Sequence, residues 1–338
     1  MVPLNVAGVG PSAALARRLG REFGKSPFNK TRVARAADRI AVALPELDAP
    51  ARRDLVLESY EHLANLAVEM ALAPRYLNED SWVDYIELGE IGGVIREMMT
   101  DGPVMLITGH CGNWEIVGYT LALLGFPMHA LYRPLDVEPM DRFVRRTRER
   151  RGLMPLSKFG AIHELPAIME AGGTVGFVAD QNAGERGLFV PFFNRLASTY
   201  KTIGLVAQKY RAPVIVGQAR RLPPTPGGPR RLHHQLDMED IIHPEDWESQ
   251  PDPLFYLTAR YRRAIERMVL RSPEQYLWMH RIWKSRPRHE RLDREFPPAL
   301  REKLAQLPWM TDADVEALVD RSDRDREWLR DNNATRML

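Results

Sequence analysis

His110 stands between two glycines in the stretch ITGHCGNWEIVG, residues 107–118, and Glu115 follows it by five positions. A neutral imidazole can take a proton from a hydroxyl near pH 7 when one ring nitrogen is held as a donor and the other faces the substrate. A carboxylate such as that of Glu115 can hold the ring in this way. These residue types and their spacing indicate general base catalysis by His110, with an ordinary loop histidine as the alternative.

The residues around His110 predict a turn between a strand and a helix. The preceding run VMLIT, residues 104–108, has the length and β-branched content of a buried strand, and apolar residues recur at helical spacing over 114–124. The crevice beyond the carboxyl ends of strands is where open α/β sheets bind ligands. The first turn of the helix also offers backbone N–H groups, which could stabilise an oxyanion formed when an alcohol attacks a thioester.

The same alternation of strand and helix continues along the chain. Strand patterns occur at 128–133, 174–180 and 213–221, and helix patterns occur at 139–151, 160–171, 200–210 and 252–273. Strands that alternate with helices predict an α/β fold with a mostly parallel central sheet flanked by helices.

Two helical regions flank this core. Residues 31–80 have apolar residues at helical spacing and predict an N-terminal helical cap, whereas residues 289–338 predict a charged C-terminal helical tail. The proline- and glycine-rich run at 221–231 predicts a hairpin turn. We therefore divide the chain into a helical region at 1–95 with a possible membrane-surface contact, an α/β core at 96–288, and the tail.

Composition excludes several classes of protein. The chain has 338 residues, 44% of them hydrophobic, and a net charge of +2, which allows a large core and argues against a general binder of polyanions. A single cysteine, Cys111, excludes an intrachain disulfide and fits a reducing compartment. We find no apolar run of the ~18–20 residues that span a bilayer and no secretory signal, so we expect the protein on the cytoplasmic side.

The N-terminal region has a local excess of basic residues. Over residues 1–40 they alternate with the apolar residues Leu15, Leu19, Phe23 and Phe28. This pattern could lie on an anionic membrane surface. The alternative is a helix packed on the body of the protein with its basic face in water.

The stretch GHCGNWE, residues 109–115, resembles the His-x4-Asp/Glu motif of the lysophospholipid acyltransferase superfamily. It has the glutamate form of the lipid A late acyltransferase and phosphatidylinositol mannoside acyltransferase branch. Three later segments resemble blocks of that branch in the same order: YRP at 132–134, ADQNAGERGLFVPFF at 179–193 and PEQYLWMHRIWKSRP at 273–287. Four ordered blocks over roughly residues 30–288 favour the catalytic interpretation of His110.

The resemblance implies an O-acyltransferase of lipid A and lipopolysaccharide biosynthesis. It would move a fatty acyl chain from acyl carrier protein or coenzyme A to a hydroxyl of a lipid A precursor or related glycolipid. His110 would deprotonate that hydroxyl and Glu115 would orient the imidazole, with no metal, cofactor or acyl-enzyme, so that Cys111 is a packing residue. The implied location is the cytoplasmic face of the inner membrane, by peripheral attachment. An acyl thioesterase and a non-catalytic lipid-binding homologue are the alternatives.

The same blocks supply candidate substrate-binding residues. Arg133 follows a strand that should run beside the first one, so it could hold a phosphate in the crevice, or else form an ion pair, for instance with Asp180. Asp180 and Gln181 match the third block and are implied to position substrate or to shape the loop. Asn113 in the motif and Arg186 in GERG complete the set.

The basic run DRFVRRTRERRG at 141–152 has two interpretations. It is either a solvated helix face or, in an acyltransferase, a surface for an acidic acyl carrier protein or for lipid head groups. Nucleic acid is not expected as a partner, because Phe143 is the one aromatic residue in the run and a stacking platform needs several.

Overall fold

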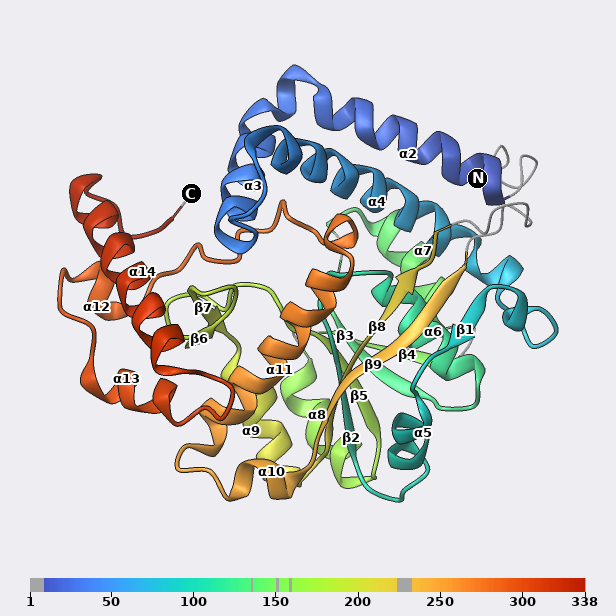
Figure 1. Ribbon diagram of the computed structural model, residues 1–338. Helices are drawn as coiled ribbons and strands as arrows, with labels where there is room; N and C mark the ends of the chain where they lie inside the picture. The colour runs from blue at the N-terminus through green and yellow to red at the C-terminus, as the bar shows by residue number, and fades with distance from the viewer. Residues whose placement is uncertain (1–8, 135, 150–151, 158–159, 224–232, 338) are drawn as a thin grey trace.

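The computed structural model describes residues 9–134, 136–149, 152–157, 160–223 and 233–337. Its centre is a seven-stranded sheet with the strand order β1-β9-β8-β2-β5-β3-β4 (Figure 1). The strands are β1 (Ile86–Leu88), β2 (Val104–Thr108), β3 (Met128–Tyr132), β4 (Leu153–Ser157), β5 (Thr174–Val178), β8 (Val214–Arg221) and β9 (His234–Ile242). A separate two-stranded ribbon pairs β6 (Leu188–Pro191) with β7 (Leu196–Thr199).

Five neighbouring strands of the sheet, from β4 to β8, run parallel. Strand β9 pairs with β8 in the antiparallel sense, and β1 is parallel to β9. The predicted α/β fold with a mostly parallel central sheet is confirmed. The hairpin predicted at 221–231 is represented by the pairing of β8 with β9, while its turn at 224–232 lies outside the described residues.

Helices cover both faces of the sheet (Figure 1). One face carries α5 (Gly92–Met98), α6 (Trp114–Leu123) and α7 (Glu138–Glu149), and the other carries α8 (Ala161–Glu170), α9 (Lys201–Tyr210), α10 (Pro244–Glu248) and α11 (Pro253–Arg271). Alternate residues of β2 enter two different hydrophobic clusters, Met105 and Ile107 on the α11 side and Val104 and Leu106 on the α6 side. A sheet that is buried on both faces therefore holds the end of β2 rigidly.

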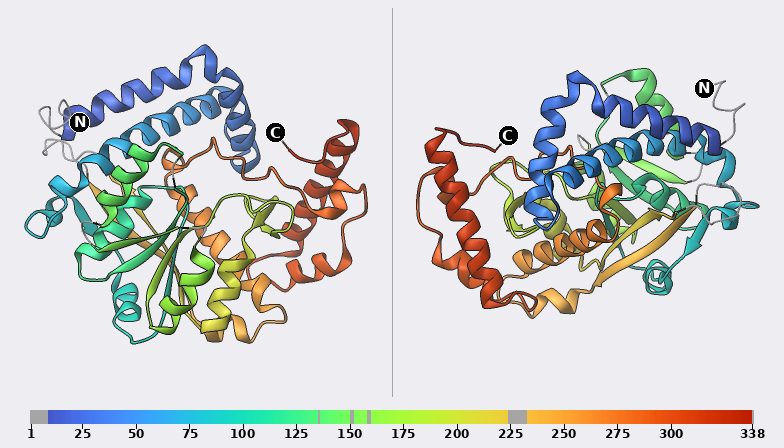
Figure 2. Two further views of the ribbon diagram at one scale, coloured as in Figure 1. Left: turned by 180° about the vertical axis from the view of Figure 1, so that it is seen from behind. Right: turned by 45° about the horizontal axis from the view of Figure 1, so that its top comes forward.

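Three N-terminal helices form the predicted cap. They are α2 (Val9–Lys25), α3 (Lys30–Ala43) and α4 (Ala49–Tyr76), and Figure 2 shows α2 lying along α4 on the outside of the molecule. Small residues of α2 make this contact, because a Cβ at Gly20 would meet the carbonyl of Tyr60. Close packing through small residues leaves the larger side chains of α2 on the outer face.

The C-terminal tail is helical, as predicted, and packs onto the core. Its helices are α12 (Arg288–Arg291), α13 (Pro298–Ala305) and α14 (Asp312–Asp331). The larger hydrophobic cluster, which contains Met105 and Ile107 of β2, also contains four residues of the tail: Leu304, Leu307, Val315 and Leu318. Within the described parts of the chain, no helix combines the length and apolar character needed to cross a bilayer.

Candidate active site

His110 lies at the carboxyl end of β2, on the turn that leads into α6. All five residues of β2 are buried, so the strand is fixed before the turn begins. The turn depends on Gly112, which has a φ of +58° and packs so closely on β8 that a Cβ would clash with the carbonyl of Ala219. The predicted strand, turn and helix around His110 are confirmed.

Asp180 is the carboxylate that holds the imidazole. His110 Nδ1 lies 2.6 Å from Asp180 Oδ1, and the backbone N–H of His110 donates to Asp180 Oδ2 at 2.9 Å. Burial alone would raise the pKa of Asp180, but the charge of His110 and its hydrogen bonds keep that pKa well below the usual range. An ionised Asp180 accepts the proton of Nδ1, which leaves Nε2 as the nitrogen able to accept a proton from a substrate.

Glu115 does not occupy the place at the imidazole that we predicted for it. Its two oxygens accept hydrogen bonds from Arg148 Nε at 2.9 Å and from Arg148 Nη2 at 2.5 Å. The helix begins at Trp114, and the side chain of Asn113 caps the N–H groups of Glu115 and Ile116. Glu115 therefore stands in the first turn of α6 and is paired with Arg148 of α7.

Two aromatic side chains enclose the ring of His110. The ring of Trp114 lies 4.8 Å from it and that of His280 lies 4.4 Å from it, both edge to face. Gln181 Nε2 lies 3.4 Å from His110 Nε2, and its contact with substrate stays a prediction. Burial, followed by the charge of His110, lowers the pKa of His280 to about 4. Sequence reasoning missed His280, although it stands in the block at 273–287.

The other predicted binding residues are spread around the site. Arg133 directly follows β3, and its side chain is 67% exposed and lies 3.8 Å from Asp136. Asp180 is instead bonded to His110, so the alternative of an ion pair between Arg133 and Asp180 is wrong. Arg186 is exposed on the loop between β5 and β6. Asn113 is completely buried, and its side-chain amide donates to Glu69. This contact is structural and differs from the predicted contact with substrate.

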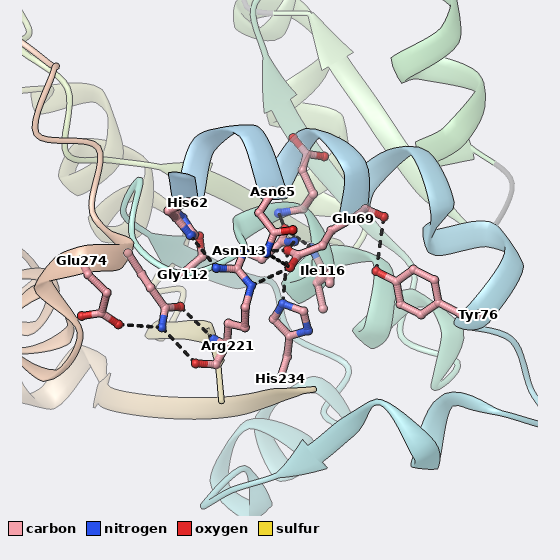
Figure 3. Close-up of polar contacts among 12 residues, drawn as sticks. His62, Asn65, Glu69, Tyr76, Gly112, Asn113, Ile116, Arg221, His234 and Glu274 are labelled. Carbon is pink, nitrogen blue, oxygen red and sulfur yellow. Dashed lines mark hydrogen bonds and ion pairs between the residues drawn. The ribbon is translucent and has the colours of Figure 1, made fainter. Parts of the chain in front are cut away.

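A buried cluster holds the turn from the side of α4 (Figure 3). Glu69 accepts hydrogen bonds from Arg221 at 2.6 and 2.9 Å and from Asn113 Nδ2 at 2.6 Å. His62 Nε2 donates to the carbonyl of Gly112 at 3.0 Å, and its Nδ1 lies 3.0 Å from Arg221 Nη1. The cluster therefore fixes the two residues that come directly before α6.

The charges in this cluster are opposite and matched. Burial would raise the pKa of Glu69, but the guanidinium of Arg221 holds it well below the usual range. Burial and the same guanidinium lower the pKa of His62 to about 3. At neutral pH Glu69 is thus ionised and His62 is neutral, which is the arrangement that their hydrogen bonds with Arg221 require.

Most amides of the turn are not free, contrary to our prediction of an open oxyanion site there. The N–H of Gly112 donates to Gln275 O at 3.0 Å, and that of Asn113 donates to Ala219 O at 2.7 Å. The Asn113 side chain takes the amides of Glu115 and Ile116. Donors for an oxyanion must therefore come mainly from elsewhere in the site.

An apolar cavity that is partly open to solvent lies between α6 and the sheet. Its lining comes largely from aliphatic side chains of α6, β2, β8 and β9, including Leu121, Leu106, Ile215 and Leu236. Trp114 belongs both to this lining and to the ring contacts of His110. The Glu115–Arg148 pair supplies the charged part of the wall.

Comparisons with known proteins find acyltransferases among the proteins that are similar to this chain. The lipid A biosynthesis palmitoleoyltransferase of Escherichia coli K12 is 28% identical over 275 residues, covering 80% of this chain and 85% of that protein. The lipid A biosynthesis lauroyltransferase of the same organism is 24% identical over 277 residues, with the same coverage. The crystal structure of the 1-acyl-sn-glycerophosphate acyltransferase PlsC from Thermotoga maritima aligns with 75% of this chain and 98% of that chain, at 12% identity and a TM-score of 0.32.

The family model of bacterial lipid A biosynthesis acyltransferases matches residues 8–285, which is most of the chain. The matched range includes the turn of His110, the end of β5 with Asp180, and the segment that carries His280. This chain therefore belongs to the bacterial lipid A biosynthesis acyltransferase family and is an O-acyltransferase.

Proposed function

We propose that the enzyme transfers a fatty acyl chain from an acyl thioester to a hydroxyl of a lipid A precursor or a related glycolipid. His110 is the general base, and Asp180 is the positioning residue that orients it. The observation that carries this proposal is the His110–Asp180 hydrogen bond of 2.6 Å beside an apolar cavity. A base next to a space for hydrocarbon is what acyl transfer requires.

The transfer proceeds through one tetrahedral intermediate. His110 Nε2 takes the proton of the acceptor hydroxyl as its oxygen bonds to the thioester carbon. The C–S bond then breaks, and the thiolate leaves with the proton that His110 had taken. Asp180 stabilises the imidazolium between these two steps, because its carboxylate is buried and stays ionised.

The apolar cavity is the place that we propose for the acyl chain of the donor. Its aliphatic lining suits a hydrocarbon chain, and Trp114 connects the cavity with the imidazole. The Glu115–Arg148 pair joins α6 to α7 at the cavity wall, so we assign Glu115 to the support of the donor site. In this arrangement the thioester carbon lies near His110 while the chain extends under α6.

Direct transfer is favoured over an acyl-enzyme. Cys111 is the neighbour of His110, but its side chain is completely buried, and burial together with the charge of Asp180 raises the pKa of the thiol well above its usual value. A protonated, enclosed thiol is a poor nucleophile. Cys111 instead packs within the larger hydrophobic cluster.

Helix α7 supports acyl carrier protein as the donor. Arg142, Arg145 and Arg146 are exposed on α7, while Arg148 of the same helix lines the cavity. An acidic carrier protein that binds the exposed arginines would place its acyl group near the cavity. Two further arginines of the predicted basic run, Arg150 and Arg151, lie outside the described residues.

The outer face of the N-terminal helices supports peripheral attachment to the cytoplasmic face of the inner membrane. Leu15, Leu19 and Phe23 recur every four residues on α2 and are each more than half exposed, and Phe28 is 92% exposed. Basic residues such as Arg18 flank this row. An apolar row flanked by basic residues is the pattern of a helix that lies on anionic lipid.

The direct test is an assay with purified protein, a lipid A precursor in mixed micelles, and either acyl carrier protein or coenzyme A as the acyl carrier. Mass spectrometry should find one acyl chain added to the glycolipid, with a preference for the carrier protein. His110→Ala should lower the rate by about 10²–10⁴, because it removes the base. Release of free fatty acid at the same rate with and without acceptor would identify a thioesterase, and binding without turnover would identify a non-catalytic homologue.

A further inference from the structure

The oxyanion of the tetrahedral intermediate needs hydrogen-bond donors at the thioester carbonyl oxygen. Such donors stabilise the charge that collects on this oxygen as the acceptor attacks. The amides of Gly112, Asn113, Glu115 and Ile116 are already bound to other groups. Side chains that surround the imidazole of His110 are therefore candidate donors.

His280 is a polar side chain in direct contact with that imidazole. The two ring centroids lie 4.4 Å apart, with an angle of 64° between the ring planes. The segment that carries His280 is tied to the catalytic turn, because the N–H of Leu277 donates to the carbonyl of His110 at 3.0 Å and the N–H of His280 donates to Leu277 O at 3.0 Å. The position of His280 relative to the base is thus fixed by the backbone.

Within the described part of the chain, the ring of His280 has an unpaired nitrogen. Nδ1 is buried and has no hydrogen-bond partner among the residues that the structure describes, and the side chain as a whole is partly exposed. Burying an N–H group without a hydrogen-bond partner costs free energy. The tautomer that leaves the buried Nδ1 unprotonated and carries the proton on Nε2 is therefore favoured. That tautomer offers an N–H on the open part of the ring.

We propose that His280 is a further catalytic residue, which donates an N–H hydrogen bond to the thioester carbonyl oxygen as that oxygen becomes an oxyanion. This inference rests on the proposed function of His110. No proton is transferred from His280: the acceptor proton goes to His110 and then to the leaving thiolate, while the hydrogen bond from His280 strengthens as the O–C bond forms and relaxes as the C–S bond breaks.

The electrostatics of the site agree with a neutral donor. Burial and the charge of His110 lower the pKa of His280 to about 4, so the ring is neutral at physiological pH. Asp180 is bonded to Nδ1 of His110, which leaves Nε2 of His110 as the nitrogen that can accept the proton of the acceptor. A neutral imidazole can polarise a carbonyl group in this way without competing for the proton. The two histidines thus have separate tasks, although their rings touch.

The test compares His280→Phe with His280→Gln in the acyl-transfer assay. Phenylalanine keeps a ring against His110 but removes the donor, so kcat should fall by about 10²–10³ while the KM of the donor changes less than about threefold. Glutamine keeps an N–H and should retain at least about tenfold more activity than the phenylalanine variant. His289→Phe is the matched control, because His289 is also buried with a pKa lowered to about 4 but bonds Ser322 in the C-terminal helices.

The activities of the His280 variants decide whether His280 is the oxyanion donor. If His280→Phe keeps kcat within about threefold of the parent, or if the glutamine variant loses as much activity as the phenylalanine variant, His280 is not the oxyanion donor. Should His280→Phe fail to fold, the comparison of His280→Gln with His280→Ala in the same assay decides, with equal rates overturning the proposal. A parent enzyme that transfers no acyl group at all would instead refute the proposed function, which keeps the two failures apart.

Discussion

At the scale of single residues, the partners of two carboxylates decide how the site works. Asp180 contacts the imidazole of His110, and Glu115 contacts the guanidinium of Arg148. Residues that act through one another show non-additive effects when both are replaced. Double replacements can therefore assign each carboxylate to its partner by kinetics alone.

We expect Asp180→Asn to lower kcat by about 10²–10⁴, because the imidazole loses the charge that holds its productive tautomer. The same change should cost little more in a His110→Ala background. Glu115→Gln should instead be non-additive with Arg148→Met and raise the KM of the donor. Steady-state kinetics of the single and double variants provide the measurement. If Glu115→Gln became silent in the His110→Ala background while Asp180→Asn remained additive, the orienting role would belong to Glu115.

The sequence predicted the base and its turn but not the partner of the base. His110 and its flanking glycines are contiguous, so their pattern is local. Asp180 meets His110 because β5 pairs with β2 in a register that sets Val178 opposite Thr108. A register between strands that are 70 residues apart cannot be read from one sequence. Glu115, five residues after His110, was therefore predicted as the partner of the imidazole, but it pairs with Arg148. His280 was missed for the same reason, since its contact with His110 is also long-range.

At the scale of elements, strongly apolar strands were predictable and mixed ones were not. The predicted strands over β2, β3, β5 and β8 are confirmed. We did not predict β4, which contains Pro155, or β9, whose residues alternate weakly and are mostly half-buried. Periodicity reports the burial of a strand, so a strand with partial burial gives a weak pattern.

The contact between α4 and the catalytic turn leads to a second prediction. Asn113→Ala removes both the cap of α6 and a donor to Glu69, so we expect a loss of about 1–3 kcal/mol in the free energy of unfolding. It should also lower kcat, because the turn that carries His110 loses an anchor. Urea unfolding and kinetics together make the measurement.

Asn65→Ala is the control for this prediction. Asn65 Nδ2 also donates to Glu69, at 3.2 Å, but Asn65 lies on α4 and has no hydrogen bond to the turn among the described residues. It should therefore destabilise the protein with little effect on kcat. If both variants lost stability and neither lost activity, the cluster would serve the fold alone.

The outer face of α2 leads to a third prediction. Leu19→Glu combined with Phe28→Glu should abolish sedimentation with vesicles that contain anionic lipid. The apolar row can then no longer insert into the membrane, and the added negative charges are repelled by the anionic lipid surface. The unfolding temperature should stay near that of the parent, since both side chains are mostly exposed. Leu205→Glu, on the exposed side of α9, is the control. Binding that survives the double replacement would place the membrane contact elsewhere on the protein.

At the scale of the whole molecule, buried ion pairs join the C-terminal helices to the core. Arg286 contacts Glu290 at 2.7 Å and Asp325 at 2.8 Å, and Arg195 contacts the same Asp325 at 2.6 Å. All four side chains are nearly or completely buried. The composition of residues 289–338 predicted a charged helical tail but not these buried pairs, since composition does not tell a charge paired inside the protein from one in water.

Buried neutral histidines should make the stability of the whole molecule depend on pH. The pKa of His62 is lowered to about 3, because burial and the charge of Arg221 oppose its protonation. The unfolded chain binds this proton near pH 6.5 and the folded chain does not, so the stabilising effect is complete above pH 6.5 and is lost as the pH falls toward the folded pKa. Glu266 and Glu290 act in the opposite sense at acid pH, because burial raises their pKa.

The fourth prediction isolates the contribution of His62. Between pH 6.5 and 5 the free energy of unfolding should fall less steeply in His62→Gln than in the parent, by a difference of up to about 1.4 kcal/mol per pH unit, which corresponds to one proton. Glutamine can still donate to the carbonyl of Gly112, so the variant should fold, and the opposing glutamates cancel in the comparison. Urea unfolding at several pH values makes the measurement, with the exposed His163→Gln as the control. Equal slopes for the parent and His62→Gln would mean that His62 is protonated in the folded protein, and the hydrogen bond that its Nδ1 accepts from Arg221 would then have to be absent.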